Sequence, residues 1–383
     1  MPSSVGPFLI LVSSPGTHLS FYVLLSHRSH NPTSKPSMAS FDITPEKEAS
    51  ISNFLYRQLF VHPSPTPAHS VKLNECTAIV TGANSGLGLE CCRKLLGLGL
   101  RRLVMAVRDE SKGQKALASL PTSSASQPIA TTIDVWSLDL SSYDSTTAFA
   151  RRATQELERL DIVVMAAGGS RPSFSLNPST HHEEVVQVNY LSTVLLTILL
   201  LPVMKSKNQT QHSGRIVLVS SDTAAWANIG GNGDSPVLSM VEKQENYNRQ
   251  QQYQNSKLLG QLFLSEAARR VPPSVAILTA ANPGLCYGTS LNRDAPPVIG
   301  SLVLLFVRLL GRSPSQGANV IINAATCHGS EAHGQYIGDN KIKPMAPLIY
   351  EPRGSRISEV LWRETMDALA FAGVEEIIRE MVN

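Results

Sequence analysis

The chain has 383 residues, of which 42% are hydrophobic and 16% charged, so it can bury a large core as one α/β domain or two smaller ones. Its formal net charge is only +3 and no block of lysine and arginine is longer than a pair, which argues against a nucleic-acid partner. The five cysteines are odd in number and lack the two-residue separation typical of zinc and redox sites. This favours a reducing compartment and predicts no metal site.

Residues 1–40 are rich in serine, proline and histidine and contain two short apolar patches, Phe8–Val12 and Phe21–Leu25. Neither patch approaches the roughly 20 apolar residues that span a bilayer, and no lysine or arginine precedes the first patch as in a signal peptide. We therefore predict a disordered extension, which could precede a true start at Met38.

Residues 41–70 predict a helix followed by a linker, and residues 71–383 are expected to form the main domain. Pro45 suits a first helical position, and His62–His69 is rich in proline. We expect the helix to dock on the main domain through its apolar face, which comprises Ile51, Phe54, Leu55, Leu59 and Phe60.

The segment Cys76–Glu90 reads as a strand, a glycine-rich turn and a helix. Such a turn presents bare N–H groups to a pyrophosphate at a helix N-terminus, where the peptide dipoles favour an anion. Gly82 would allow the sharp turn, Gly86 the approach of a phosphate, and Gly88 the packing of the helix on the strand. A glycine triplet by itself is a weak signal, because glycine-rich turns are common.

The spacing of this segment, TGxxxGxG, resembles the cofactor loop of the short-chain dehydrogenase/reductase family, and the later motifs follow that family's order over about residues 75–340. The resemblance implies an α/β fold: one doubly wound (Rossmann) domain with a parallel seven-stranded sheet of order 3-2-1-4-5-6-7 and helices on both faces. It also implies cofactor contacts from Gly82, Ser85, Gly86, Leu87 and Gly88. The further predicted strands are Arg102–Val107, Thr132–Leu138, Leu160–Ala166, Arg215–Ser220, Val275–Ala280 and Gly334–Gly338.

The second predicted strand ends at Arg108, where dinucleotide folds meet the adenosine ribose. A carboxylate there favours NAD, whereas a guanidinium can pair with a 2′-phosphate, so Arg108 argues for NADP. A shift of register by one residue would put Asp109 in its place. Lys112 either adds positive charge nearby or is a solvated lysine of the first helical turn.

Three other strand ends complete the expected cofactor site. Asp139 and Leu140 follow the third strand, where the family places a carboxylate near the adenine, although Asp139 could instead cap a helix beginning at Ser141. The fourth strand runs into Gly168, but the family's asparagine before this motif is absent, so we expect a less tightly held loop. The sixth strand runs into NPG. The resemblance implies cofactor contacts from Gly168, Pro283, Gly284 and Thr289, with Ser290 or backbone as substitutes for Thr289, which comes one residue later than in the family's PGxxxT.

The expected catalytic group follows the fifth strand, which closes on Ser221. Tyr253 and Lys257 lie four residues apart, so on a helix they share one face, and an ammonium beside a phenol would lower the phenol's pKa. YxxxK alone is a weak signal, but its place between a VSS strand and an NPG turn is specific. The resemblance implies that Ser221, Tyr253 and Lys257 form the catalytic group with Asn189, and that Tyr253 and Lys257 also contact the cofactor.

Two segments are expected near the substrate. Residues 223–252 form an insertion that is similar to one in the retinol-dehydrogenase-like branch, and it either borders the substrate mouth or is a passive surface loop. Residues 284–311 are expected to form the substrate loop. Within them the apolar run Val298–Leu310 is interpreted first as a helix covering the pocket and second as a membrane-surface contact.

The resemblance implies an NADP(H)-dependent oxidoreductase that reduces a ketone or aldehyde of a small apolar metabolite, or oxidises the corresponding alcohol. The stretches SKLLGQLF and NPGLCYGTSL look like fungal members of the family that act in secondary-metabolite biosynthesis. The alternatives are a retinol-type or steroid-type alcohol dehydrogenase and a non-catalytic NADP-sensing protein. We expect a cytoplasmic protein with no nucleic-acid partner and no membrane contact, and the family usually forms dimers or tetramers.

Overall fold

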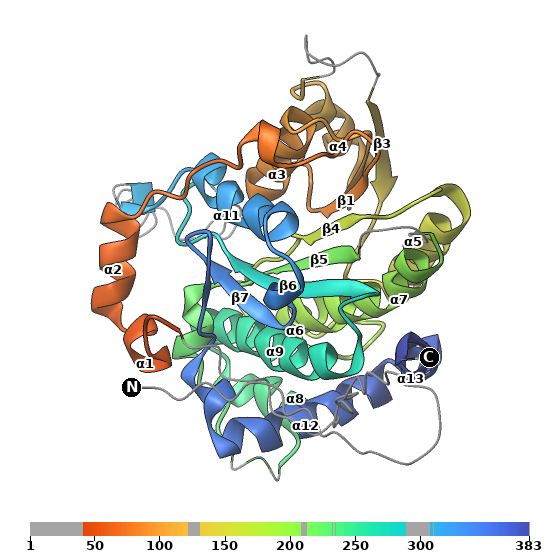
Figure 1. Cartoon of the computed structure of the whole chain (residues 1–383). Helices are drawn as coiled ribbons and strands as arrows, with labels where there is room; N and C mark the ends of the chain where they lie inside the picture. Colours follow the sequence, from red (N-terminus) through yellow and green to blue (C-terminus); the bar gives the residue numbers. More distant parts are fainter. Residues whose placement is uncertain are drawn as a thin grey trace, which may run out of the picture. The chain divides into compact units, whose positions relative to one another are not determined.

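The computed structural model describes residues 41–121, 131–207, 213–231, 233, 235–288, 307–308 and 310–382. These residues build one central sheet with helices on both faces (Figure 1). The strands are β1 (Thr77–Thr81), β2 (Arg102–Val107), β3 (Thr132–Ser137), β4 (Ile162–Met165), β5 (Gly214–Val219), β6 (Ala276–Asn282), β7 (Gln335–Gly338) and β8 (Lys341–Lys343).

The sheet has the order β3-β2-β1-β4-β5-β6-β7-β8, and its first seven strands are parallel. The prediction of a doubly wound sheet with order 3-2-1-4-5-6-7 is therefore confirmed. The prediction missed β8, which pairs antiparallel with β7. Asp339 and Asn340 join the two strands with φ angles of 52° and 62°, and two such left-handed residues make a tight hairpin turn. The sequence of β8, KIK, is too short and too polar to be recognised as a strand.

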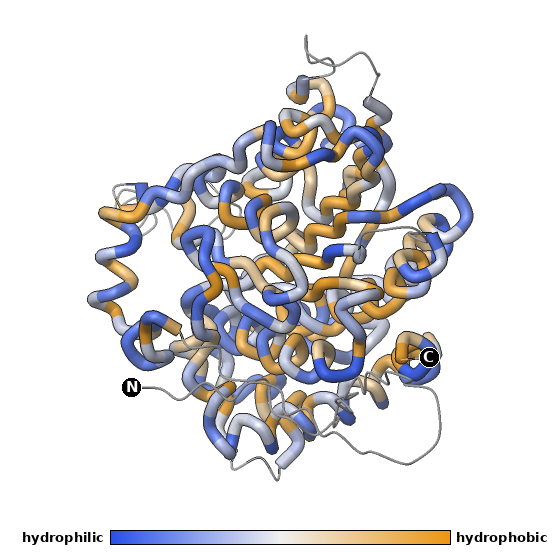
Figure 2. Tube along the Cα trace, in the orientation of Figure 1, coloured by the Kyte–Doolittle hydropathy of each residue, from blue (hydrophilic) through white to orange (hydrophobic). Residues whose placement is uncertain are grey.

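Alternate residues of each strand face opposite helical layers. In β1, Ala78 and Val80 join one buried cluster with α3 (Gly86–Gly97) and α11 (Pro314–Thr326). Ile79 faces the other cluster, which contains α5 (Tyr143–Glu156), α7 (Ser192–Lys207) and α9 (Arg249–Arg270). Because both faces are covered, the central strands are mostly apolar, as Figure 2 shows.

Among the residues that the structure describes, one helical segment, Glu184–Lys207, is long and apolar enough to cross a membrane, but 78% of its apolar window is buried inside the protein. It consists of α6 (Glu184–Val186), the π-helical turn η2 (Gln187–Leu191) and α7. The segment is apolar on all sides because α5, α9 and α13 (Val374–Val382) also contact it. It is thus a core helix of this fold.

The chain ends in helices that cover α9. They are α12 (Pro352–Ala368) and, after it, α13. Gly373, whose φ is 65°, separates α12 from α13.

The 223–252 insertion supplies α8 (Val237–Val241). The first N–H groups of this helix, those of Val237 and Leu238, donate to the Glu364 carboxylate of α12. The remaining helical segments are α4 (Glu110–Leu117), η1 (Ala68–Ser70), η3 (Asp222–Trp226), η4 (Gln244–Asn246), η6 (Ser330–Ala332), η7 (Pro347–Tyr350) and η8 (Ala370–Ala372).

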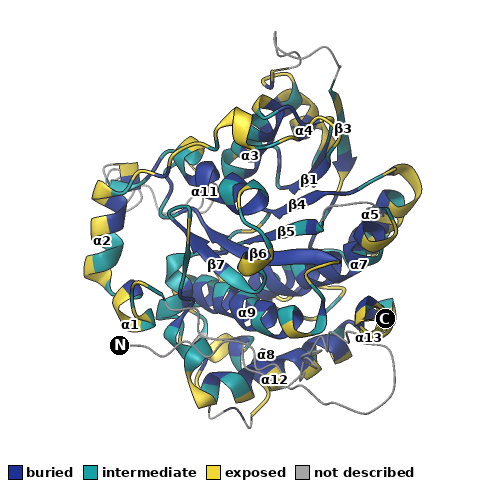
Figure 3. Cartoon of the chain, viewed as in Figure 1, coloured by how far each residue is buried: buried dark blue, intermediate teal, exposed yellow. Residues whose placement is uncertain are grey.

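The N-terminal helices are α1 (Pro45–Glu48) and α2 (Ile51–Phe60), and Pro45 occupies the first helical position as expected. The expected docking face of α2 is correct only in part: Phe54 packs edge-on against Trp226 of the main domain, with ring centroids 5.4 Å apart. Ile51 and Phe60 are each 67% exposed, whereas Arg57 and Gln58 are buried. Figure 3 shows exposed and buried stretches side by side along α2. Arg57 and Gln58 thus face inward, because the groups they meet there are carboxylates and backbone atoms.

Candidate active site

The glycine-rich turn after β1 makes a cradle for an anion. Gly82 and Gly86 have φ angles of 65° and 53°, a left-handed conformation that favours glycine. Ser85 is the N-cap of α3, so the first N–H groups of this helix point out of the turn. This arrangement fits the pyrophosphate of a dinucleotide, and it is where the sequence placed the cofactor loop.

Gly88 sets how closely α3 approaches the turn. A Cβ atom at this position would lie 2.4 Å from the backbone oxygen of Gly82, so only glycine fits without a shift of the helix. Leu87, also an expected cofactor contact, has its side chain against the backbone of Gly317 in α11. Its side chain therefore belongs to the interface of α3 and α11.

At the end of β2, Arg108 and Asp109 have different surroundings. The Asp109 carboxylate is the N-cap of α4: it accepts hydrogen bonds from Lys112 N at 3.1 Å and Ser111 Oγ at 2.9 Å, and these bonds lower its pKa to about 2. Lys112 itself is an exposed first-turn lysine whose Nζ lies 3.2 Å from that carboxylate. Arg108 is exposed beside this cap.

Asp139 and Leu140 follow β3. The Asp139 carboxylate accepts hydrogen bonds from Ser141 N at 3.0 Å and Ser141 Oγ at 2.7 Å, while Leu140 is buried in the core. The N-cap of α5 is Ser142, so the alternative of a helix beginning at Ser141 is wrong by two residues. Asp139 shapes the turn that precedes the cap.

The loop after β4 is held by side chains from two other elements. Thr81 Oγ1, at the end of β1, accepts a hydrogen bond of 2.9 Å from Ala167 N. Asn189 accepts one of 2.9 Å from Gly169 N and donates one of 2.8 Å to Gly169 O. The expectation of a loosely held loop is therefore wrong, because these bonds replace the bracing that the family's asparagine would give.

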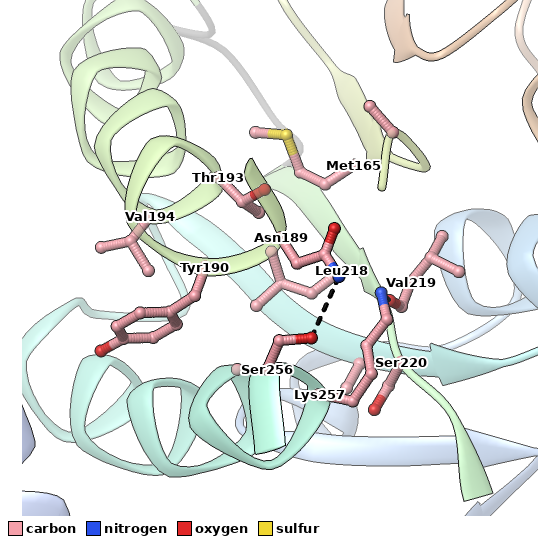
Figure 4. A pocket seen from close by; sticks show the side chains of 13 residues that line it. Met165, Asn189, Tyr190, Thr193, Val194, Leu218, Val219, Ser220, Ser256 and Lys257 are labelled. Atoms are coloured by element: carbon pink, nitrogen blue, oxygen red, sulfur yellow. Dashed lines mark hydrogen bonds between the residues drawn. The ribbon is translucent and has the colours of Figure 1, made fainter. Parts of the chain in front are cut away.

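Asn189 also connects this loop to α9. Its Nδ2 donates to Ser256 Oγ at 3.0 Å, next to Lys257, as Figure 4 shows. Asn189 lies in the π-helical turn η2, an irregularity that is frequent at functional sites and that changes the direction of side chains within a helix. A Cβ atom on Gly168 would lie 3.0 Å from Asn189 Oδ1 and 3.7 Å from Lys257 Nζ, so these three residues meet.

Ser221 and Tyr253 come together at the carboxyl end of β5. Burial raises the pKa of the Tyr253 phenol to about 12, and a hydrogen bond with Ser221 acts in the opposite direction. Thr223 Oγ1 donates to Ser221 Oγ at 3.0 Å. The expected lowering of the tyrosine pKa is wrong, because burial disfavours the phenolate more than its polar neighbours favour it.

Lys257 lies one helical turn after Tyr253. Its Nζ donates a hydrogen bond of 2.8 Å to Val219 O and lies 5.6 Å from the centre of the Tyr253 ring. Burial lowers the pKa of this ammonium to about 8. The lysine is therefore close to its titration point under physiological conditions.

A cavity extends behind Lys257 toward the interior, between the sheet and helices α7 and α9 (Figure 4). The centre of a water-sized molecule can occupy about 30 Å³ of it. Its polar wall contains Asn189, Ser220, Ser256 and Lys257. Its apolar wall includes Met165, Val194 and Leu218. The polar side can accommodate water that bridges these groups.

Sequence reasoning missed two residues at the turn after β6. Gln58 of α2 accepts a hydrogen bond of 3.1 Å from Leu285 N, and Arg312 donates one of 3.3 Å to Pro283 O. Gly284, with a φ of 78°, leaves no room for a Cβ, which would lie 2.5 Å from Gln58 Oε1. The sequence offers Gln58 as a signal, because it interrupts an apolar stretch of α2, but nothing marks Arg312.

Thr289, Ser290 and most of the expected substrate loop, residues 284–311, lie outside the described residues. The five cysteines are thiols and form no disulfide. Within the part of the chain that the structure describes, no group of three or more histidine, cysteine, aspartate or glutamate side chains could hold a metal ion.

Comparison with known proteins agrees with this arrangement. Residues 76–232 match the family described as short chain dehydrogenase. The chain is 45% identical over 344 residues to the short-chain dehydrogenase fogG of Aspergillus ruber, covering 88% of this chain and 98% of that protein. It is 38% identical over 344 residues to the short chain dehydrogenase/reductase mfmJ of Annulohypoxylon moriforme, covering 90% and 99%.

Solved structures share the fold at lower identity. A short chain oxidoreductase from Pseudomonas aeruginosa, described as NADPH-bound and as containing an atypical catalytic center, aligns with a TM-score of 0.51 and 19% identity over 70% of this chain and 96% of that one. An uncharacterized protein from Mycobacterium paratuberculosis aligns with a TM-score of 0.55 and 23% identity, covering 80% and 98%. With a nucleotide cradle, a Ser–Tyr–Lys group at the strand ends and relatives that match over nearly their full length, the chain belongs to the short-chain dehydrogenase/reductase family of oxidoreductases.

Proposed function

We propose that the protein is an NADP(H)-dependent oxidoreductase that reduces a ketone or aldehyde of a small apolar metabolite, or oxidises the corresponding alcohol. The observation that carries the proposal is the meeting of Ser221, Tyr253 and half-buried Lys257 at the carboxyl ends of the strands, where β1 also ends in the glycine-rich turn. The likeness to short-chain dehydrogenases of several fungi supports a role in fungal secondary-metabolite biosynthesis.

The preference for NADP over NAD rests on the end of β2. Asp109 already serves as a helix cap, so its carboxylate is engaged by Lys112 and Ser111 rather than available to a ribose hydroxyl. Arg108 is exposed beside it and has the planar guanidinium that suits a phosphate. A 2′-phosphate would therefore meet a cation at this strand end.

The bound nicotinamide would supply the hydride for reduction. Tyr253 would donate the proton to the developing alkoxide, since its raised pKa keeps the phenol protonated at working pH. Ser221 would donate a hydrogen bond to the same substrate oxygen and hold it beside the phenol. In its charged form, Lys257 would stabilise the phenolate that Tyr253 leaves behind.

The proton lost from Tyr253 must be replaced from solvent. Asn189, Ser256 and Lys257 share the polar wall of the cavity behind the site. We propose that water in this cavity relays protons to Lys257, with Asn189 fixing the water through the same amide that holds the β4 loop. The absence of a disulfide among the five cysteines supports a reducing compartment such as the cytoplasm.

Replacing Tyr253 with phenylalanine tests the proposal. We expect Tyr253→Phe to lose at least about 100-fold in kcat, the usual contribution of a general acid, while the NADPH dissociation constant changes little. NADPH oxidation is followed by absorbance against a panel of aromatic and alicyclic ketones, and NADPH binding by fluorescence. A non-catalytic NADP sensor would bind NADPH but turn over no carbonyl compound. A retinol-type or steroid-type dehydrogenase would instead oxidise apolar alcohols with NADP⁺.

A further inference from the structure

The N-terminal helix α2 contacts the turn that carries Ser221. Arg57 Nη2 donates a hydrogen bond of 2.5 Å to Asp222 Oδ1, and Asp222 directly follows Ser221. The side chains of Arg57 and Asp222 are only 5% and 9% exposed. Trp226, at the end of the same turn, donates a 2.7 Å bond to Ala49 O between the two N-terminal helices. The turn is thus attached to the N-terminal segment at both of its ends.

Arg57 belongs to a buried network of three cations and three anions. Its Nε and Nη1 lie 3.4 Å from Glu48 and 3.7 Å from Asp339. Arg312 and Lys343 contact Asp339 at 2.6 Å and 3.0 Å, and Lys343 also reaches Glu48 at 3.3 Å. Burial tends to raise the pKa of Asp339, but Arg312, Lys343 and Arg57 outweigh it and the pKa is lowered.

Docking a helix through buried charges carries a large desolvation penalty. Buried charges lose hydration, so an apolar interface of the same size would stabilise the contact at lower cost. The helix has apolar residues, yet it leaves Ile51 and Phe60 exposed and buries Arg57 and Gln58. What the polar contacts provide, and apolar ones do not, is a fixed direction for the groups they bond.

Gln58 fixes the second functional turn. Its amide nitrogen donates to Leu285 O at 3.0 Å and Leu310 O at 3.2 Å, and its oxygen accepts from Leu285 N at 3.1 Å. Both donors and the acceptor of the amide are therefore used on backbone atoms. The same side chain closes off the space above Gly284. One helix thus bonds to the turns after β5 and after β6.

We propose that Arg57 and Gln58 are positioning residues of the active site. Arg57 holds the Ser221 turn through Asp222, and Gln58 holds the Pro283–Leu285 turn. This inference rests on the proposed function for the roles of the two turns: Ser221 with the substrate oxygen, and Pro283–Gly284 with the nicotinamide end of the cofactor. Two adjacent residues should therefore have separate effects, Arg57 on turnover and Gln58 on cofactor affinity.

The first test is hydrogen exchange of the NADPH-bound protein, measured by mass spectrometry, which needs no substrate. Arg57→Met should increase exchange at least about threefold in the peptide around residues 220–226 and leave residues 283–288 unchanged. Gln58→Leu should do the reverse. The control is Glu266→Gln, which removes buried ion pairs with Arg269 and Arg270 near the far end of α9 and should change neither peptide. Uniform exchange increases across the chain, or no change in the two peptides, would overturn the inference.

The second test separates kcat from binding, with isatin as the ketone and NADPH fluorescence for affinity. Arg57→Met should lower kcat about tenfold or more with an NADPH affinity within about twofold of wild type, and Arg57→Lys should restore part of the rate. Gln58→Leu should weaken NADPH about tenfold. If Arg57→Met and Gln58→Leu each lowered kcat and NADPH affinity by the same factor, the role of Arg57 and Gln58 would be merely structural. If the wild-type protein reduces no ketone while the exchange pattern holds, the proposed function fails and the positioning of the turns stands.

Discussion

Lys257 Nζ donates its 2.8 Å hydrogen bond to Val219 O, two residues before Ser221 in the sequence. The bond holds α9 against the carboxyl end of β5. Ser221 follows the same strand, so one strand end positions both the lysine and the serine. The ammonium is therefore placed by the sheet as well as by its helical spacing from Tyr253. Burial at this position lowers its pKa to about 8.

We expect the rate of ketone reduction to fall as pH rises above about 8. Below the folded pKa Lys257 is charged and can stabilise the phenolate of Tyr253; above it the lysine is neutral and that stabilisation is lost. The measurement is kcat from pH 6 to 10 at saturating NADPH. A rate that stays constant across this range would contradict the role of the lysine.

The same pKa has a consequence for stability. Between about pH 8 and 10.5 the unfolded chain holds the Lys257 proton and the folded chain does not, so this group makes the free energy of unfolding rise with pH in that window. The free energy of unfolding, measured with urea at several pH values, should rise more steeply with pH in this window for the wild type than for Lys257→Met. The same pH dependence of the free energy of unfolding in both proteins would show that the lysine has an ordinary pKa in the folded chain.

Arg108→Ala should weaken NADPH binding at least about tenfold, the lower end for a lost hydrogen bond to a charged group, and should leave NADH binding nearly unchanged. The reason is that only NADPH carries a 2′-phosphate for the guanidinium to contact. Fluorescence titration with both nucleotides measures the effect. Lys115→Ala, which removes an exposed cation of α4, is the control. Equal losses for the two nucleotides would remove the NADP assignment.

Gly88→Ala should destabilise the fold by about 1–3 kcal/mol, the usual cost of forcing extra atoms into a packed site. The added Cβ would lie 2.4 Å from Gly82 O, so α3 must move away from the turn and NADPH binding should be lost with it. Gly97→Ala is the matched control in the same helix, since its Cβ would meet nothing within 4 Å. We expect that control to be neutral or slightly stabilising in urea unfolding.

Two truncations should give opposite results. Removing residues 1–40 leaves α1 and α2 in place, and we expect an unchanged melting temperature and activity. Removing residues 1–61 deletes Glu48, Arg57 and Gln58, so the Asp222 carboxylate loses the arginine that neutralises it. Because the turn after β5 then lacks its bonds to α2, we expect kcat to fall about tenfold or more. Full activity of the shorter protein would refute the role given to α2.

Much of this protein can be predicted from local sequence. The glycine turn was recognisable because left-handed backbone and close packing admit almost only glycine, as at Gly82 and Gly88. The seven parallel strands were recognisable because a sheet covered on both faces needs continuous apolar runs. Tyr253 and Lys257 were recognisable because helical geometry alone puts residues four apart on one face.

Other features depended on contacts between distant parts of the chain. The Asp109 and Arg108 alternatives could not be separated until the carboxylate was found capping α4. The pKa values of Tyr253 and Lys257 depend on burial, which spacing does not reveal. Part of the inward face of α2 was mispredicted for the same reason: hydrophobic periodicity assumes an apolar partner, whereas Arg57 meets Asp222 and Asp339, 165 and 282 residues further along the chain, and only folding brings those charges together.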